Sequence, residues 1–218
     1  MKKSLPIKQE DIENKIIDWI DVGSSSRLIV FKNITGKVKA DLVIKKKGDY
    51  QESAETKSFG STIKRMQVFK RPKQATEVFL QVNSSSEPII NGIFKKDIPK
   101  DGFTADKNSY LMFVYFDEVG QDISSYFWLV PSVFFRDSVE PIKLPDGKEV
   151  FRFESPIEIN KPSKFQKFLV HKLDFGNVLL KIINSKGDYN FKASDVIGLD
   201  TVNLDVLKKF VAEARRNT

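Results

Sequence analysis

Two apolar runs in the middle of the chain limit what it can fold into. Residues 110–116 (Tyr-Leu-Met-Phe-Val-Tyr-Phe) show no alternation with polar residues, and residues 126–130 (Tyr-Phe-Trp-Leu-Val) follow after a polar loop and stop at Pro131. A strand with one face in water alternates apolar and polar residues, whereas a strand covered on both faces is apolar throughout. We therefore expect these runs to form an antiparallel pair in the core of a covered sheet.

The segments before these runs predict a helix and then a hairpin. Between residues 7 and 20, apolar residues recur at i, i+4, i+7 and i+8 from Ile12, which is the spacing of one helix face. Residues 27–32 and 38–44 are rich in β-forming residues and are joined through Thr35-Gly36, so they predict a β-hairpin.

The remaining elements follow from shorter patterns. Strands are expected at 66–69, 78–82 and 149–153, a polar loop at 45–60, and either a long loop or short helical turns at 87–106. A helix stripe is expected from Phe165, Phe168, Leu169 and Leu173, and a last helix from Asn203, a suitable N-cap. With 218 residues, no repeat and no linker, the chain predicts a single α/β domain over 1–218 with a mixed central β-sheet flanked by helices.

Composition excludes several kinds of chemistry. The chain has no cysteine and one histidine, so disulfides, thiolate zinc sites and cysteine nucleophiles are excluded, and histidine chemistry would rest on His171 alone. His171 lies in a lysine-rich stretch and is expected at the surface. A metal site would have to use carboxylate and carbonyl oxygens, which favours Mg²⁺ or Mn²⁺.

Cysteine content, apolar runs and net charge bear on the cellular location of the protein and on its partners. The absence of cysteine fits a reducing cytoplasm. No apolar run reaches the ~20 residues of a membrane span, and the basic start of the chain is not followed by a signal-peptide core. The formal net charge of +7 makes an anionic partner plausible, although many basic proteins have none.

Three polar residues on predicted strands are candidates for a functional site. Asp41 lies in the second strand of the predicted hairpin, in Ala-Asp-Leu-Val-Ile, and Gln81 and Asn83 lie in a later strand, in Phe-Leu-Gln-Val-Asn-Ser-Ser. Residues two apart on a strand share a face, so Gln81 and Asn83 are expected to project together. A buried strand that ends in a polar turn is the structural alternative.

The order helix, hairpin, carboxylate on the second strand, polar pair on the third, and then a strand ending in Val130-Pro131-Ser132 resembles the PD-(D/E)xK superfamily of restriction-endonuclease-like proteins. The resemblance covers about residues 7–135 and implies a restriction-endonuclease-like fold and Mg²⁺-dependent cleavage of nucleic acid. It implies Asp41 and Gln81 as metal ligands and Asn83 at the position of the catalytic lysine.

The chain departs from that pattern in two ways. Gln81 is a neutral ligand in place of a carboxylate, and Asn83 cannot supply the positive charge that stabilises a phosphate. Lys95 or Lys96 is a candidate for a displaced lysine. The departures predict an atypical or inactivated nuclease site.

Two acid-free basic stretches predict contact with nucleic acid, with DNA favoured over RNA. They contain seven residues that are expected to contact the phosphate backbone without reading the base sequence. These are Lys64, Arg65, Lys70, Arg71, Lys73, Lys164 and Lys167. Phe69, among the first group, is a candidate for base stacking but is better explained as core. The alternative function is a non-catalytic module that binds an acidic protein partner through the same basic surface.

Overall fold

The structure is a computed structural model that describes residues 8–33, 39–47, 51–59, 62–70, 76–87, 89–117, 122–158, 161–187 and 189–191. For 51–59 and 62–70 it describes the backbone. The predicted Thr35-Gly36 turn, Arg71, Lys73 and the predicted helix from Asn203 lie outside the described residues.

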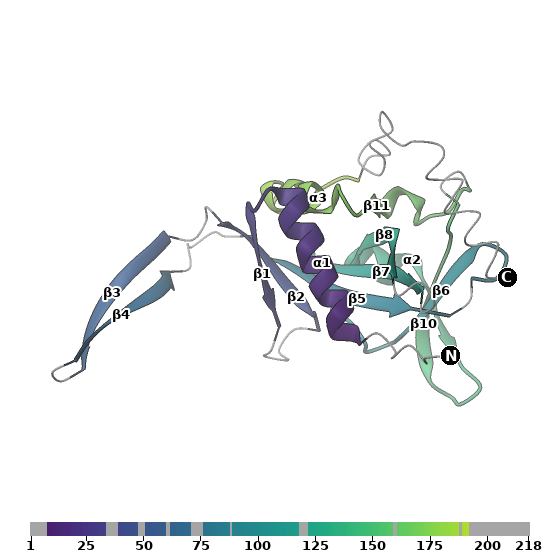
Figure 1. Ribbon diagram of the computed structural model, residues 1–218. Coiled ribbons are helices and arrows are strands. Elements are labelled where there is room, and N and C mark those ends of the chain that lie inside the picture. The colour runs from purple at the N-terminus through teal and green to yellow at the C-terminus, as the bar shows by residue number, and fades with distance from the viewer. Residues whose placement is uncertain are drawn as a thin grey trace, which may run out of the picture.

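A six-stranded mixed sheet forms the centre of the molecule (Figure 1). Its order is β1 (Leu28–Lys32), β2 (Leu42–Lys46), β5 (Val78–Ser85), β7 (Ser109–Asp117), β8 (Asp122–Pro131) and β11 (Leu169–His171). Neighbours are antiparallel except β5 and β7, which are parallel. The mixed α/β class, the β1–β2 antiparallel pair and the central β7–β8 pair are confirmed.

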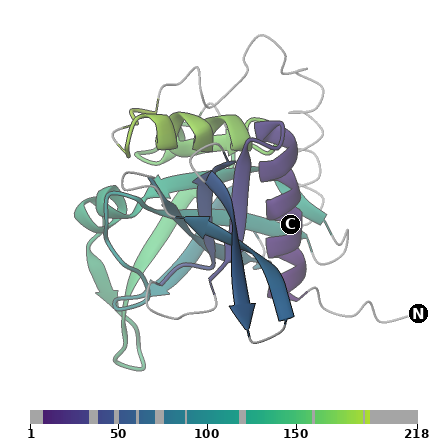
Figure 2. The same cartoon turned by 90° about the vertical axis from the view of Figure 1, so that its left-hand side faces the viewer.

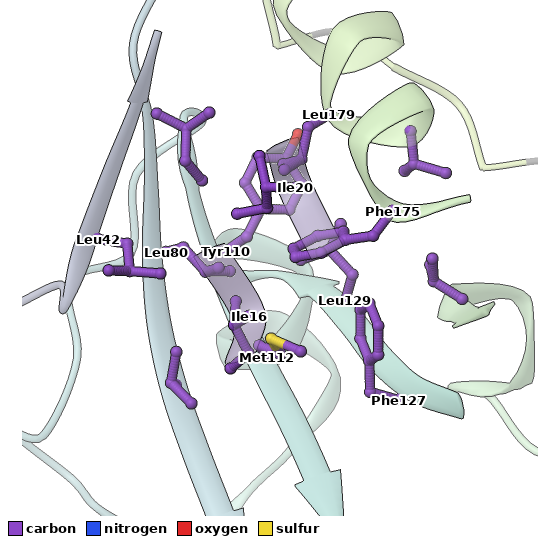
Figure 3. Packing of buried hydrophobic residues seen from close by; sticks show 14 of the residues in the cluster. Ile16, Ile20, Leu42, Leu80, Tyr110, Met112, Phe127, Leu129, Phe175 and Leu179 are labelled. Atoms are coloured by element: carbon purple, nitrogen blue, oxygen red, sulfur yellow. The ribbon is translucent and has the colours of Figure 1, made fainter. Parts of the chain in front are cut away.

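Two helices cover one face of this sheet. Helix α1 (Gln9–Ser24) buries Ile12, Ile16 and Ile20, as its periodicity predicts, and α3 (Phe175–Asn184) packs beside it. Figure 3 shows Ile16 and Ile20 of α1 together with Phe175 and Leu179 of α3, above side chains of the sheet.

The two helices touch through glycine. A Cβ atom added to Gly176 of α3 would lie 2.2 Å from the backbone nitrogen of Ser24 and 2.4 Å from the carbonyl carbon of Gly23, both in α1. Only a residue without a side chain allows this backbone approach. The Gly23–Gly176 contact therefore fixes where α1 lies over the sheet.

A second layer covers the other face. It contains a three-stranded antiparallel sheet in the order β6 (Ile93–Pro99), β10 (Glu149–Pro156) and β9 (Pro141–Lys143), with α2 (Ser132–Ser138) and a 3₁₀ turn, Gln166–Phe168. Aromatic side chains fill the space between the layers; Phe153 is fully buried and stacks on Phe113 of β7 with ring centroids 3.9 Å apart. This layer explains why β7 and β8 are apolar on both faces.

The structure corrects three expectations. Residues 87–106 contain strand β6 and are not only loop and turns. The stripe from Phe165 is not a helix: Phe168 ends the 3₁₀ turn, Leu169 begins β11, and Leu173, after β11, is 62% exposed. Residues 51–59, expected within a polar loop, form strand β3 (Gln51–Phe59), which pairs with β4 (Thr62–Lys70), a longer strand than the expected 66–69.

The β3–β4 hairpin forms a separate two-stranded sheet inserted between β2 and β5. Figure 1 shows it extending away from the two layers, and Figure 2 views the molecule from that side, with the hairpin in front. We refer to β3 and β4 together as the arm.

Candidate acidic site at the start of helix α1

Asp41 lies at the point where the pairing between β2 and β5 ends. Its backbone N–H donates to the carbonyl of Leu80 at 2.9 Å, and its carboxylate Oδ2 accepts the backbone N–H of Val82 at 2.6 Å. The side chain thus continues the ladder after the strand register stops at Leu42 and Leu80. This bond holds the carboxylate in one orientation beside β5.

The first turns of α1 lie over the same end of β5. Gln9 donates from Nε2 to the carbonyl of Val82 at 3.4 Å, and its Oε1 accepts the hydroxyl of Ser84 at 2.9 Å. One helical turn later, Glu13 lies close enough to Asp41 for the two charges to interact. A carboxylate of helix α1 and a carboxylate just before β2 therefore interact electrostatically. We call Gln9, Glu13, Lys32 and Asp41 the acidic site.

The pKa of each of these two carboxyl groups is raised above its ordinary value. Burial raises the pKa of Asp41, and the Val82 N–H opposes this by stabilising the anion. Burial also raises the pKa of Glu13, and the neighbouring Asp41 charge raises it further, while a hydrogen bond with Gln9 and the charge of Lys32 lower it. A cation placed between these carboxylates would favour their ionised forms.

Lys32 supplies positive charge next to this pair. It lies at the end of β1, and its Nζ is 3.5 Å from Oε1 of Glu10 on the first turn of α1. Its side chain is 36% exposed, and the Glu10 partner is 72% exposed, so this ion pair lies at the surface.

Gln81 and Asn83 lie on the neighbouring strand but make other contacts. Gln81 donates from Nε2 to the carbonyl of Gly102 at 3.0 Å, and Asn83 donates from Nδ2 to the carbonyl of Gln81 at 3.3 Å. Leu80 and Val82 lie in the core under α1, and strand alternation places Gln81 and Asn83 on the opposite face of β5. Among the described hydrogen bonds, none joins the side chains of Gln81 or Asn83 to Asp41, so a shared Asp41–Gln81 metal site stays a prediction.

Lys164 and Lys167 are exposed but anchored on aromatic rings. Lys167 Nζ lies 4.4 Å from the ring centroid of Phe134 and 4.9 Å from that of Phe168. Lys164 lies 5.2 Å over Phe165 and donates to the carbonyl of Ser138. Their stems therefore cover the edge of the aromatic core while the charges stay at the surface.

The other predicted basic residues divide between the arm and the second sheet. Lys64, Arg65 and Lys70 lie on β4, where the structure gives their register. Lys95, a candidate displaced lysine, lies on β6 and forms an ion pair with Glu154 at 3.3 Å.

His171 is half-buried and packs on Tyr126, with ring centroids 4.8 Å apart. Burial lowers its pKa. This contact places His171 in the packing of β11 on β8 and not fully at the surface.

The acidic site contains two carboxylates, fewer than the larger clusters that hold most metal ions. Among the described residues, no group of three or more His, Cys, Asp or Glu side chains is arranged to hold a metal ion. Mg²⁺ in phosphate-processing sites commonly takes one or two carboxylates and completes its octahedron with water and substrate oxygens. Glu13 and Asp41 are carboxylates of the kind that Mg²⁺ uses, and Lys32 carries positive charge close enough to act on Glu13.

Asp41 was a candidate from its place in the sequence, whereas Glu13, Gln9 and Lys32 were not. Glu13 directly follows Ile12 of the buried stripe, so it lies at the boundary between the core face of α1 and solvent. An acidic residue at that boundary, in a helix that precedes a hairpin carrying Asp41, was the available signal.

Comparison with protein-family models, curated proteins and solved structures gave no match. In the part of the chain that the structure describes, no helix combines the length and the apolar character needed to cross a membrane.

Proposed function

We propose that this protein associates with nucleic acid and has a restriction-endonuclease-like fold whose divalent-metal site, atypical in composition, is the acidic site. The observation that carries the proposal is the Asp41 carboxylate, held beside β5 by the Val82 N–H, with Glu13 of α1 within electrostatic range. Two interacting carboxylates with a lysine nearby suit a phosphodiester bound through a metal ion.

The arrangement of elements supports the fold part of the proposal. The order that underlies the resemblance runs through the structure as α1, the β1–β2 pair, Asp41 immediately before β2, and Gln81 and Asn83 on β5. The last matching strand, β8, ends at Pro131, and α2 begins at Ser132. The connection from β5 to the parallel β7 passes through β6 of the second sheet.

Each residue of the acidic site has a distinct role in the proposal. Glu13 and Asp41 would hold Mg²⁺ or Mn²⁺, which when bound polarises a phosphate and lowers the pKa of a water. The Val82 N–H fixes the Asp41 carboxylate, and Gln9 orients Glu13. Lys32 provides the positive charge that Asn83 cannot, and stabilises charge developing on the phosphate.

The test is cleavage of plasmid and single-stranded DNA with Mg²⁺ or Mn²⁺, comparing wild type with Asp41→Asn and Glu13→Gln. Asparagine at 41 keeps an oxygen that accepts the Val82 N–H, so this variant removes charge while retaining the strand-end bond. Asp146→Asn, in the exposed turn before β10, is the matched control for loss of one carboxylate. We expect cutting by the wild type and by Asp146→Asn, and none by the other two.

Metal binding is tested separately by thermal unfolding with and without Mn²⁺. A ligand that binds only the folded state raises its stability, so the wild type should melt at a higher temperature with Mn²⁺ and Asp41→Asn should not. Cutting that appears only in Asn83→Lys would indicate a retained site that has lost catalysis. If no variant cuts and Mn²⁺ stabilises neither protein, the metal-site proposal is refuted.

A further inference from the structure

The arm contains none of the residues of the acidic site. Each of its strands has 9 residues, which makes the ribbon ~30 Å long at ~3.4 Å per residue. Figure 1 shows it projecting beyond the end of the central sheet where β1 and β2 lie, away from β6 and β10. A two-stranded ribbon that packs on no larger sheet is only marginally stable alone, so a long projecting one suggests a partner.

Positive charge is concentrated in the outer half of the arm. Residues 56–65 contain Lys57, Lys64 and Arg65 and no acidic residue, whereas Glu52 and Glu55 lie in the half nearer the body. The strand register sets Lys57 directly opposite Lys64, and Thr56 opposite Arg65. Like charges in directly opposed positions destabilise a strand pair, and an anion bound there removes the repulsion.

The dimensions of the ribbon fit one groove of one nucleic acid. The major groove of B-DNA is ~12 Å wide and ~8.5 Å deep and admits a two-stranded β-ribbon. The major groove of an A-form RNA duplex is deep and narrow and excludes such an element. The shape of the arm and its outer cationic half therefore favour duplex DNA over duplex RNA.

We infer that the arm binds duplex DNA by entering the major groove with its outer half, where Lys57, Lys64 and Arg65 contact the phosphates on either side. This inference rests on the proposed association with nucleic acid and specifies its mode. In the sequence the arm lies between β2 and β5; it leaves this strand pair at the Ile44–Val78 end, and Asp41 lies at the Leu42–Leu80 end. A duplex held by the arm is thereby tethered to the sheet that carries the acidic site.

The experiment compares DNA binding by the full chain and two triple variants, measured by fluorescence anisotropy over a range of salt concentrations. The arm variant is Lys57→Gln/Lys64→Gln/Arg65→Gln. The control is Lys143→Gln/Lys100→Gln/Lys148→Gln, which removes the same charge from exposed positions of the second sheet and its turn. Circular dichroism verifies that both variants fold like the wild type.

Each lost phosphate contact lowers the slope of log K against log salt by about 0.9. We expect the arm variant to lose about 2 to 3 units of slope and about tenfold or more in affinity near ~0.1 M salt, and the control to change much less. Wild-type protein should protect guanine N7, which lies in the major groove, from methylation by dimethyl sulfate, and the arm variant should not. Duplex RNA should compete poorly with duplex DNA.

The alternatives give different results. If the wild type binds DNA and the two variants lose affinity equally, the charge acts diffusely; the arm inference fails and the association stands. Equal competition by duplex RNA, or absence of N7 protection, also overturns entry into the major groove. If the wild type does not bind DNA, the proposed association and the arm inference are both refuted.

Discussion

Replacing Gly176 with alanine tests the contact that positions α1, and with it Gln9 and Glu13. The added Cβ would lie 2.2 Å from the Ser24 nitrogen and 2.6 Å from the Ile20 carbonyl oxygen, whereas ordinary contacts begin at 3.4 Å. These are backbone atoms that cannot rotate aside, so α1 and α3 must separate by more than 1 Å. Overpacking of this kind costs about 1–3 kcal/mol, and sometimes more.

Helix propensity acts in the opposite direction. Alanine is favoured over glycine in a helix interior by about 1 kcal/mol, and by less near the first turn, where Gly176 lies. We therefore expect a net loss of about 1–3 kcal/mol, the lower end if the layers can shift. For a chain of this size that corresponds to a fall of about 2–4 °C in melting temperature for each kcal/mol.

The assay is urea unfolding followed by tryptophan fluorescence. The chain has two tryptophans, Trp19 on α1 and Trp128 on β8, and Trp19 stacks on Phe127 with ring centroids 6.0 Å apart, so the signal reports on the helix layer and the sheet. Asn177→Ala, at the next and exposed position of α3, is the control. A Gly176→Ala protein as stable as the wild type, or more stable, would refute the close helix contact.

Two further predictions concern the acidic site and the aromatic layer. Because burial raises the pKa of Asp41 above its ordinary 3.8, the folded protein retains a proton that the unfolded chain has already released, so this group makes stability fall as the pH rises from 3.8 through the folded-state pKa. Asp41→Asn should remove this part of the pH dependence. In urea unfolding from acid to neutral pH, the free energy of unfolding of the variant should therefore rise relative to that of the wild type. A difference between the two proteins that is the same at every pH would contradict this prediction. Phe153→Ala should cost about 3–5 kcal/mol because Phe153 is fully buried between the layers, and Phe153→Leu should cost less; a loss below about 1 kcal/mol in urea unfolding would show that the layers repack freely.

Elements with strong local patterns were predictable from the sequence. The stripe from Ile12 predicted α1, and the unbroken apolar runs predicted β7 and β8 as a pair covered on both faces. The second sheet was harder, because β6 includes Lys95, Lys96 and Asp97 and does not alternate regularly between buried and exposed positions.

The misassigned helix at 165–173 has a different cause. Phe165 and Phe168 are both buried at helix-like spacing, but the first precedes a 3₁₀ turn and the second ends it. The chain then extends into β11, where Leu169 and Val170 are buried on opposite faces, since one belongs to each core. Spacing alone cannot separate a helix from a turn followed by a doubly covered strand.

The sequence by itself excluded cysteine chemistry and determined the central strands. The absence of cysteine and the single histidine leave oxygen ligands for a metal, and the apolar runs require a sheet with both faces covered. Only the tertiary structure decided that Glu13 of α1 lies within electrostatic range of Asp41. The register of β2 on β5 sets the position of Asp41, whereas the Gly23–Gly176 contact sets that of α1, and neither long-range packing distance is encoded in the local pattern around residue 13 or 41.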